Sequence, residues 1–238
     1  MGCTTPIELS HAGTALIGQL AMPAGEGPFP AVLVMHNAAG LGQQVREVAM
    51  QLAALGYVAV ATDMYGGGQE VDPWAKGAIS QTVGRDPDLV RSRIRAWFET
   101  VAALPGVAAD RIAAIGYCFG GSCVLELARC GLPARAVVSY HGILTTTRPM
   151  ERSVFGGEVH VYSGALDPYA PHDQVEALRM EMTGAGARHA ITVFGDAAHG
   201  FTDRHYDAKG RPGIAYHELA DRVSWAGTVA LLDLVLRA

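Results

Sequence analysis

Residues 112–122 read Ile-Ala-Ala-Ile-Gly-Tyr-Cys-Phe-Gly-Gly-Ser, an apolar run that ends in glycines placed around a cysteine. The run is typical of a buried strand, and small residues two positions before and two positions after Cys118 allow a sharp turn into a helix. A side chain at such a turn stands at the helix N-terminus, where free N–H groups and the helix dipole favour a thiolate. The pattern predicts a reactive cysteine; the alternative is a structural cysteine at a tight turn.

The chain has 238 residues, of which 50% are hydrophobic, and a formal net charge of −5. This length suits one domain with a sizeable core, so we expect residues 1–238 to form a single domain. The sequence has no basic run to favour nucleic acid and no apolar run long enough to cross a bilayer. We therefore expect an enzyme that acts on small molecules, with neither nucleic acid nor a membrane as partner; the oligomeric state is left open.

The four cysteines are Cys3, Cys118, Cys123 and Cys130. Cys123 and Cys130 lie on one predicted helix with a rise of about 10 Å between them, which exceeds the reach of a disulfide. The N-terminus has no basic segment followed by an apolar one, the pattern of a secretion signal. Free thiols and a cytoplasmic location are the expectation.

Apolar runs alternate with amphipathic segments along the chain. A hairpin is predicted over residues 6–22, strands over 31–35, 57–62, 112–117, 135–141, 158–163 and 189–194, and helices over 45–55, 87–104, 119–130, 171–186 and 214–236. Residues 64–85 and 142–157 are expected to be irregular loops that supply the walls of the active site, without a shape that any spacing predicts. Strands that alternate with helices favour an α/β fold with a doubly wound, mostly parallel sheet, in which ligands bind at the carboxyl ends of the strands.

Polar side chains stand at the ends of the predicted strands. Because the carboxyl ends of parallel strands meet at one edge of a sheet, we expect these side chains to converge on one rim. They are Asn37, Asp63, Cys118, His141, Asp167 and His199. Asp63 is expected to brace the loop that follows it.

A thiol that attacks an ester carbonyl needs a base to take its proton and an acid to hold that base. Cys118, Asp167 and His199 would supply nucleophile, acid and base, in that order along the chain. Asp196 is an alternative acid, but it lies on the same turn as His199 and is the weaker candidate. No spacing of His, Cys, Asp or Glu indicates a metal site.

The oxyanion would be stabilised by backbone N–H groups. One would come from Phe119, and the second from either Asn37 or Ala38. His36 and His141 also end strands, and we expect them to be pocket walls or satisfied polar groups in place of the base. The expected pocket residues are His36, Tyr65, Trp74, His141, Ile143 and Phe201.

These motifs resemble the dienelactone hydrolase family of α/β hydrolases over most of the chain. The resemblance implies an α/β-hydrolase fold without a large cap. It also implies a Cys-His-Asp triad that cleaves esters or lactones through an acyl-enzyme, with no metal or cofactor. The matching pieces are Gly116-Tyr117-Cys118-Phe119-Gly120-Gly121, Gly164-Ala165-Leu166-Asp167, His199-Gly200-Phe201, Gly56-Tyr57 and Asp63-Met64-Tyr65.

Two positions depart from the family pattern. Members that act on dienelactone carry a Glu that holds the thiol until substrate arrives, where this chain has Asn37. They also carry a carboxylate-binding Arg at the position of Asp203, and Arg204 is one step off register. An amide cannot hold the thiol as a carboxylate does, and an acid would repel an anionic ligand. The differences predict neutral esters or lactones as substrates and a Cys118 that oxidises readily.

Phosphorus chemistry is a second expectation. Donors that receive a tetrahedral oxyanion also suit the phosphoryl oxygen of an activated triester, and the chain is similar to a family member described as a promiscuous phosphotriesterase. Two further classes stay open. One is a binding or regulatory protein that kept the fold without catalysis, to which the change at Asn37 points. The other is a thiol redox protein, which the absence of a C-x-x-C motif disfavours.

Overall fold

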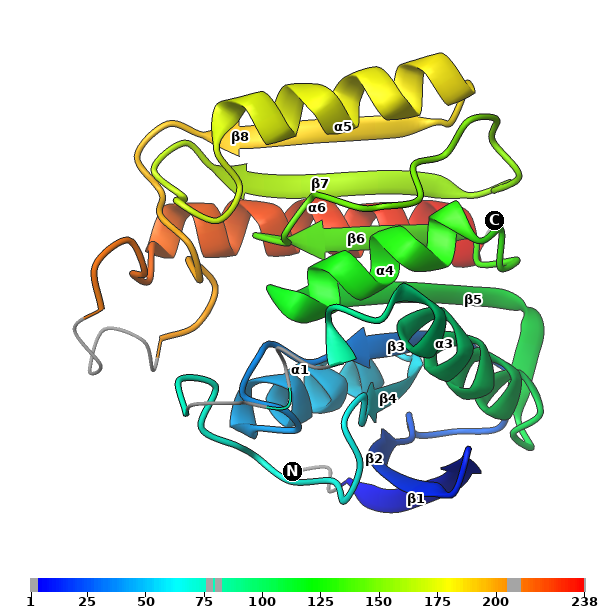
Figure 1. The fold of residues 1–238 in the computed structure, drawn as a ribbon. Coiled ribbons are helices and arrows are strands. Elements are labelled where there is room, and N and C mark those ends of the chain that lie inside the picture. The colour runs from blue at the N-terminus through cyan, green and yellow to red at the C-terminus, as the bar shows by residue number, and fades with distance from the viewer. Residues whose placement is uncertain (1–3, 76–78, 80–82, 205–210, 238) are drawn as a thin grey trace.

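The protein is described by a computed structural model that covers residues 4–75, 79, 83–204 and 211–237, so Cys3 and part of the predicted loop 64–85 lie outside the described residues. Within these ranges, eight strands form one sheet (Figure 1). The strands are β1 Thr5–His11, β2 Thr14–Ala21, β3 Phe29–Met35, β4 Val58–Thr62, β5 Val107–Tyr117, β6 Ala136–Tyr140, β7 Glu158–Gly164 and β8 His189–Phe194.

The sheet is mostly parallel, with an antiparallel hairpin at one edge. Its strand order is β1-β2-β4-β3-β5-β6-β7-β8. The β1–β2 and β2–β4 pairs are antiparallel, and each remaining neighbouring pair is parallel. The order reverses at β3, so the crossovers run to both sides of this strand. The predicted sheet type and the N-terminal hairpin are both confirmed.

Helices cover both faces of the sheet (Figure 1). Apolar residues of α1 and α6 join the core on one face, and those of α3, α4 and α5 join the core on the other. No helix of the described residues is long and apolar enough to cross a membrane. The helices are α1 Gln43–Ala54, α3 Pro87–Ala102, α4 Phe119–Arg129, α5 His172–Ala185 and α6 Glu218–Leu236.

The last helix begins later than the sequence pattern indicates. The prediction started it at Ile214, but α6 starts at Glu218 with His217 as its N-cap, whose ring nitrogen accepts from the Ala220 N–H. Ile214 instead forms a β-bridge with His199. The apolar residue 214 is therefore used to hold the loop after β8, which periodicity along the chain does not reveal.

Asp63 braces the loop after β4, as predicted. Its carboxylate accepts hydrogen bonds from the backbone N–H groups of Tyr65, Gly66 and Gly68 at 2.8 Å each, and its carbonyl accepts from Trp97 Nε1. The buried carboxylate thereby satisfies N–H groups that an irregular loop leaves without partners. Asp63 holds the loop in place and does not face the other strand-end residues.

Candidate active site

Cys118 stands in a strained turn between β5 and α4. Its backbone has φ 53° and ψ −112°, a conformation that a side-chain-bearing residue rarely adopts. A Cβ at Gly116 would lie 2.0 Å from the Gly120 carbonyl oxygen, and a Cβ at Gly120 would lie 2.2 Å from the Met35 oxygen. Only glycine fits at these two positions, and the strand-to-helix turn around Cys118 is the one the sequence predicts.

His199 and Asp167 lie together at the ends of β8 and β7. His199 Nδ1 is 2.8 Å from Asp167 Oδ2, and both side chains are buried. The other carboxylate oxygen, Oδ1, accepts from the Tyr169 N–H at 2.8 Å. The carboxylate is therefore fixed, and it orients the His199 ring. The alternative acid, Asp196, is exposed and pairs with His217.

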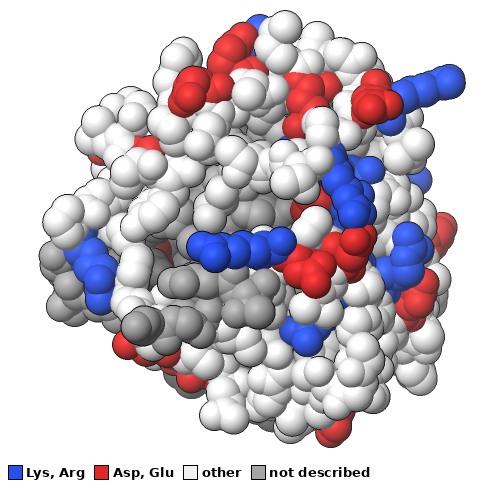
Figure 2. All heavy atoms as spheres, in the orientation of Figure 1, with Lys and Arg blue, Asp and Glu red and all other residues white. Residues whose placement is uncertain are grey.

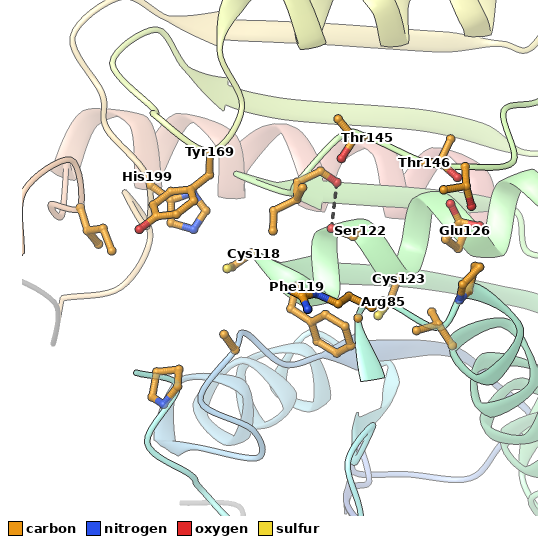
Figure 3. A pocket seen from close by; sticks show the side chains of 18 of the residues that line it. Arg85, Cys118, Phe119, Ser122, Cys123, Glu126, Thr145, Thr146, Tyr169 and His199 are labelled. Carbon is orange, nitrogen blue, oxygen red and sulfur yellow. Dashed lines mark hydrogen bonds between the residues drawn. The ribbon is translucent and has the colours of Figure 1, made fainter. Parts of the chain in front are cut away.

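Cys118 and His199 lie near each other on the wall of one cavity (Figure 3), and a hydrogen bond between them contributes to the pKa of both groups. With the contact between His199 and Asp167, the sequence-predicted trio is brought together. Burial raises the pKa of Cys118, but the charge and hydrogen bond of His199 outweigh it and bring the pKa below its usual value. Burial lowers the pKa of His199, while the Cys118 charge and the Asp167 hydrogen bond raise it to about 10. Both shifts favour a thiolate–imidazolium pair.

Two backbone N–H groups point at the sulfur. They belong to Phe119 and Ala38, and both lower the pKa of Cys118. Of the two residues considered for the second donor, Asn37 and Ala38, it is Ala38 whose N–H bonds to the sulfur. The Asn37 side chain turns away from the sulfur, since its Oδ1 accepts from the Ala39 N–H at 2.8 Å.

His36 holds the peptide that carries the second donor. Its Nδ1 lies 2.6 Å from the Asn37 carbonyl oxygen, and its Nε2 accepts from the Met64 N–H at 3.0 Å. Because Nε2 accepts, the ring proton sits on Nδ1 and is donated to that carbonyl. The carbonyl of Asn37 and the N–H of Ala38 belong to one planar peptide, so His36 fixes the direction of the Ala38 N–H.

A cavity of about 620 Å³ opens at Cys118. Figure 2 shows charges of both signs scattered over this face of the molecule. The cavity is lined by Ala38, Pro73, Trp74, Gly84, Arg85, Pro87, Val90, Cys118, Phe119, Ser122, Cys123, Glu126, Ile143, Thr145, Thr146, Thr147, Tyr169, His199 and Ile214.

Of the predicted pocket residues, Trp74 and Ile143 line this cavity and the other four do not. His36, Tyr65, His141 and Phe201 are buried behind it. As pocket residues these four are misplaced, because each is the inward-facing residue at the end of a strand or in the following loop. His36 and His141 instead agree with the alternative of a hydrogen-bonded polar group. The rings of the four pack against one another or against the wall residues; Tyr65, for example, contacts Phe119 with ring centroids 5.3 Å apart.

Several wall residues were not predicted. Tyr169 packs on His199 with ring centroids 4.7 Å apart, and its position two residues after Asp167 was the available signal. Figure 3 shows Arg85 extended along the cavity beside Phe119. Glu126 also reaches the wall.

The charge of Glu126 is balanced inside the protein. Arg91 and Arg129 pair with its two carboxylate oxygens at 2.6 and 3.0 Å, and Arg129 also pairs with Glu181. Arg85, by contrast, forms no ion pair with any other described residue. Among the described residues that line the cavity, Arg85 is therefore a charged side chain whose charge no ion pair balances.

Neither of the two positions that depart from the family pattern, Asn37 and Asp203, lines the cavity. Asp203 and Arg204 line a second, smaller hollow of about 220 Å³, together with Tyr117 and Asp221. The predicted repulsion of an anionic substrate by Asp203 is therefore wrong, because its carboxylate does not face the space beside Cys118.

Cys118, Cys123 and Cys130 are free thiols. Within the described ranges, no group of three or more His, Cys, Asp or Glu side chains is placed to hold a metal ion. The ring of His141 packs edge-on against His199, with centroids 5.1 Å apart, and its Nε2 lies 2.9 Å from Thr202 Oγ1. His141 is thus a buried, hydrogen-bonded neighbour of His199.

Comparison with known proteins agrees with the sequence resemblance. The family model described as the dienelactone hydrolase family matches residues 16–236. A Bradyrhizobium protein with the provisional name 2-oxo-3-(5-oxofuran-2-ylidene)propanoate lactonase is 26% identical and covers 95% of this chain and 92% of its own length.

Two solved structures are similar over nearly their whole length. One, named m3DLH, is 35% identical with a TM-score of 0.92 and covers 99% of both chains. The other, a dienelactone hydrolase-like promiscuous phosphotriesterase, P91, from metagenomic libraries, is 31% identical with a TM-score of 0.91 and covers 98% of both chains.

Proposed function

The chain belongs to the dienelactone hydrolase family, and we propose that it is a cysteine hydrolase of esters or lactones with Cys118 as nucleophile, His199 as base and Asp167 as the acid that holds the base. One observation carries the proposal: the Cys118 sulfur is met both by the ring of His199 and by two backbone N–H groups. Attack on a carbonyl needs these partners at one atom.

In the acylation step, the Cys118 thiolate attacks the carbonyl carbon of the substrate and forms a carbon–sulfur bond. The carbonyl oxygen takes the negative charge and accepts hydrogen bonds from the N–H groups of Phe119 and Ala38. His199, protonated in the resting pair, donates its Nε2 proton to the departing alkoxide as the carbon–oxygen bond breaks. The products of this step are a thioester on Cys118, an alcohol and a neutral His199.

In the deacylation step, the neutral His199 takes a proton from water, and the resulting hydroxide attacks the thioester carbon. The tetrahedral intermediate uses the same two N–H groups, and its collapse expels the Cys118 thiolate. The carboxylic acid leaves, and the thiolate–imidazolium pair is restored. Asp167 keeps the His199 ring oriented through both steps and stabilises its positive charge.

Carboxylic esters or lactones with an apolar body are the substrates that this cavity suits best. Its walls include Trp74, Ile143, Phe119 and Val90, and its volume of about 620 Å³ suits a small molecule. The charge of Glu126 is neutralised by its arginine partners. The unbalanced charge of Arg85 favours an acidic substituent on the substrate over a basic one.

Activated phosphotriesters are a second candidate substrate class, which the 31% identity to the phosphotriesterase P91 over 98% of both chains favours. The Cys118 thiolate would displace a phenolate from phosphorus while the Phe119 and Ala38 N–H groups bind the phosphoryl oxygen. Water activated by His199 would then cleave the phosphorus–sulfur bond. The free thiols favour a reducing, cytoplasmic setting, and the expected partners are small-molecule substrates, with neither nucleic acid nor a membrane.

The test compares wild type with Cys118→Ala on p-nitrophenyl acetate, a lactone panel and diethyl p-nitrophenyl phosphate. We expect wild type to turn over at least the activated ester and to form an acyl adduct on Cys118, detected by mass spectrometry of the intact protein. Cys118→Ala should lose both. Turnover that persists in Cys118→Ala would rule out this nucleophile, and a folded wild type without turnover on the whole panel would favour a binding protein.

A further inference from the structure

Four polar side chains form a continuous line of hydrogen bonds behind the cavity. Asn37 Nδ2 donates to Gln44 Oε1 at 3.3 Å, and Gln44 Nε2 donates to Thr202 Oγ1 at 3.1 Å. Thr202 Oγ1 lies 2.9 Å from His141 Nε2. None of the four lines the cavity, so they touch the site only from outside.

The Thr202 hydroxyl is the group that joins the two ends of this line. Its oxygen accepts from the Gln44 amide, and the same hydroxyl bonds to His141 Nε2. Burial, followed by the nearby charge of His199, lowers the pKa of His141 well below its usual value, so its ring is neutral. A hydroxyl donates to a bare Nε2 or accepts from a protonated one, so the bond forms with either tautomer of the neutral ring.

The two ends of the line meet the two halves of the catalytic site. At one end, Asn37 Oδ1 accepts from the Ala39 N–H, directly beside the Ala38 donor. At the other end, the His141 ring contacts His199, and Thr202 lies in the loop that follows His199. The line runs from the oxyanion donor to the base.

The sheet alone does not set the distance between the loop that carries Ala38 and the loop that carries His199. The Ala38 loop follows β3 and the His199 loop follows β8, and β5, β6 and β7 lie between those two strands. No ladder hydrogen bonds join β3 to β8 directly. Side chains that reach from one loop to the other are the direct means of fixing their spacing.

We infer that the line Asn37–Gln44–Thr202–His141 positions the Ala38 oxyanion donor relative to the base His199. The inference rests on the proposed function, because it takes His199 as the base and the Ala38 N–H as an oxyanion donor. It also gives Asn37 a role: its amide accepts from Ala39 and donates to Gln44, and a carboxylate at this position has no hydrogen to donate. All four are positioning residues, because none touches the reacting atoms.

The variants Thr202→Val and Gln44→Met remove the central bond with little change of shape. Thr202→Ser retains the hydroxyl, and Gln43→Met is the matched control, because the neighbouring Gln43 bonds only to Glu47 on the exposed face of α1. The first readout is the pKa of Cys118, taken from the rate of alkylation by iodoacetamide against pH in the absence of substrate. The second is kcat and KM for p-nitrophenyl acetate.

We expect the pKa of Cys118 to rise in Thr202→Val and Gln44→Met, because His199 and the Ala38 N–H both lower it when they are in place. In these variants kcat should fall about 10-fold, with KM within about two-fold of wild type. The double variant should be no worse than the worse single one, since each single change already interrupts the one continuous line. Thr202→Ser and Gln43→Met should behave as wild type.

An unchanged pKa of Cys118 and an unchanged kcat would overturn the inference, even if the melting temperature falls. Additive losses in the double variant would also overturn it. If Thr202→Val or Gln44→Met does not fold, Asn37→Asp removes the first donor with the same shape and is judged by the same two readouts. Alkylation needs no ester, so a wild type without turnover would refute the proposed function while the pKa measurement still decides this inference.

Discussion

Asp167 Oδ2 lies 2.8 Å from His199 Nδ1, both side chains are buried, and the contact supports the positive charge that faces Cys118. Asp167→Asn preserves the shape of the side chain but removes its negative charge. We expect kcat/KM for p-nitrophenyl acetate at pH 7 to fall by about 10²–10⁴-fold. Asp196→Asn is the control and should stay near wild type; equal losses in both variants would contradict the assignment of the acid.

The pH dependence of alkylation measures the thiolate directly. In the folded protein the pKa of Cys118 lies below its usual value of 9.0. The thiolate therefore persists as the pH falls below 9 and is protonated only when the pH passes through the lowered pKa. In a Cys3→Ala/Cys123→Ala/Cys130→Ala background, which leaves Cys118 as the single thiol, the iodoacetamide rate should reach half its maximum below pH 9. With His199→Ala added, burial is the main remaining influence and the midpoint should move above 9. A midpoint that does not move would show that His199 does not activate the thiol.

Oxidation by peroxide should be selective among the thiols of the described residues. Burial raises the pKa of Cys123 well above its usual value and also raises that of Cys130, whereas the pKa of Cys118 is lowered. Thiolate is the form that peroxide attacks, so Cys118 should be oxidised first. Peptide mass spectrometry over a peroxide titration measures this order. Equal rates at the three residues would contradict the prediction.

The turn at Cys118 should tolerate no side chain at Gly116. The added Cβ would lie 2.0 Å from the Gly120 oxygen, so Gly116→Ala should lower the free energy of unfolding by about 1–3 kcal/mol and abolish alkylation of Cys118 at neutral pH. Gly184→Ala, in α5 with no neighbour within 4 Å of the added atom, is the matched control. It should change stability by at most about 1 kcal/mol, in the favourable direction. Denaturant unfolding compares the two.

Arg85 should discriminate between substrates by charge. Its side chain lines the cavity and forms no ion pair with another described residue, so Arg85→Ala should lower kcat/KM for the p-nitrophenyl half-ester of succinate by about five-fold. The neutral p-nitrophenyl butyrate should change by less than about two-fold. The ratio of the two rates, measured at low and at high salt, tests the effect. An unchanged ratio would place the charge of Arg85 away from the bound substrate.

The sequence predicts the site correctly where a chemically reactive residue stands at the end of a strand. Cys118, Asp167 and His199 each follow a strand of the parallel part of the sheet, and parallel strands bring their ends to one rim. Their meeting was therefore predictable from the strand pattern and the chain order. The roles of Gly116 and Gly120 were also predictable, because few residue types other than glycine fit so tight a turn. The fold and the trio therefore followed from local patterns.

The cavity walls did not follow from such patterns. Arg85, Thr145 and Tyr169 reach the cavity from irregular segments, whose course no periodicity fixes. His36 and Phe201 were misplaced because the end of a strand has two sides, and only one of them faces the cavity. The second oxyanion donor, Ala38, depended on the direction of one peptide, which His36 sets through a hydrogen bond that the sequence does not reveal.

The strained backbone at Cys118 has an evolutionary consequence. The turn is created by the absence of side chains at Gly116 and Gly120 and does not depend on the sulfur. The identity of the nucleophile is thus separable from the geometry that presents it. A lineage with this turn is able to exchange a thiol for a hydroxyl by one substitution, without rebuilding the strand, the helix or the oxyanion donors.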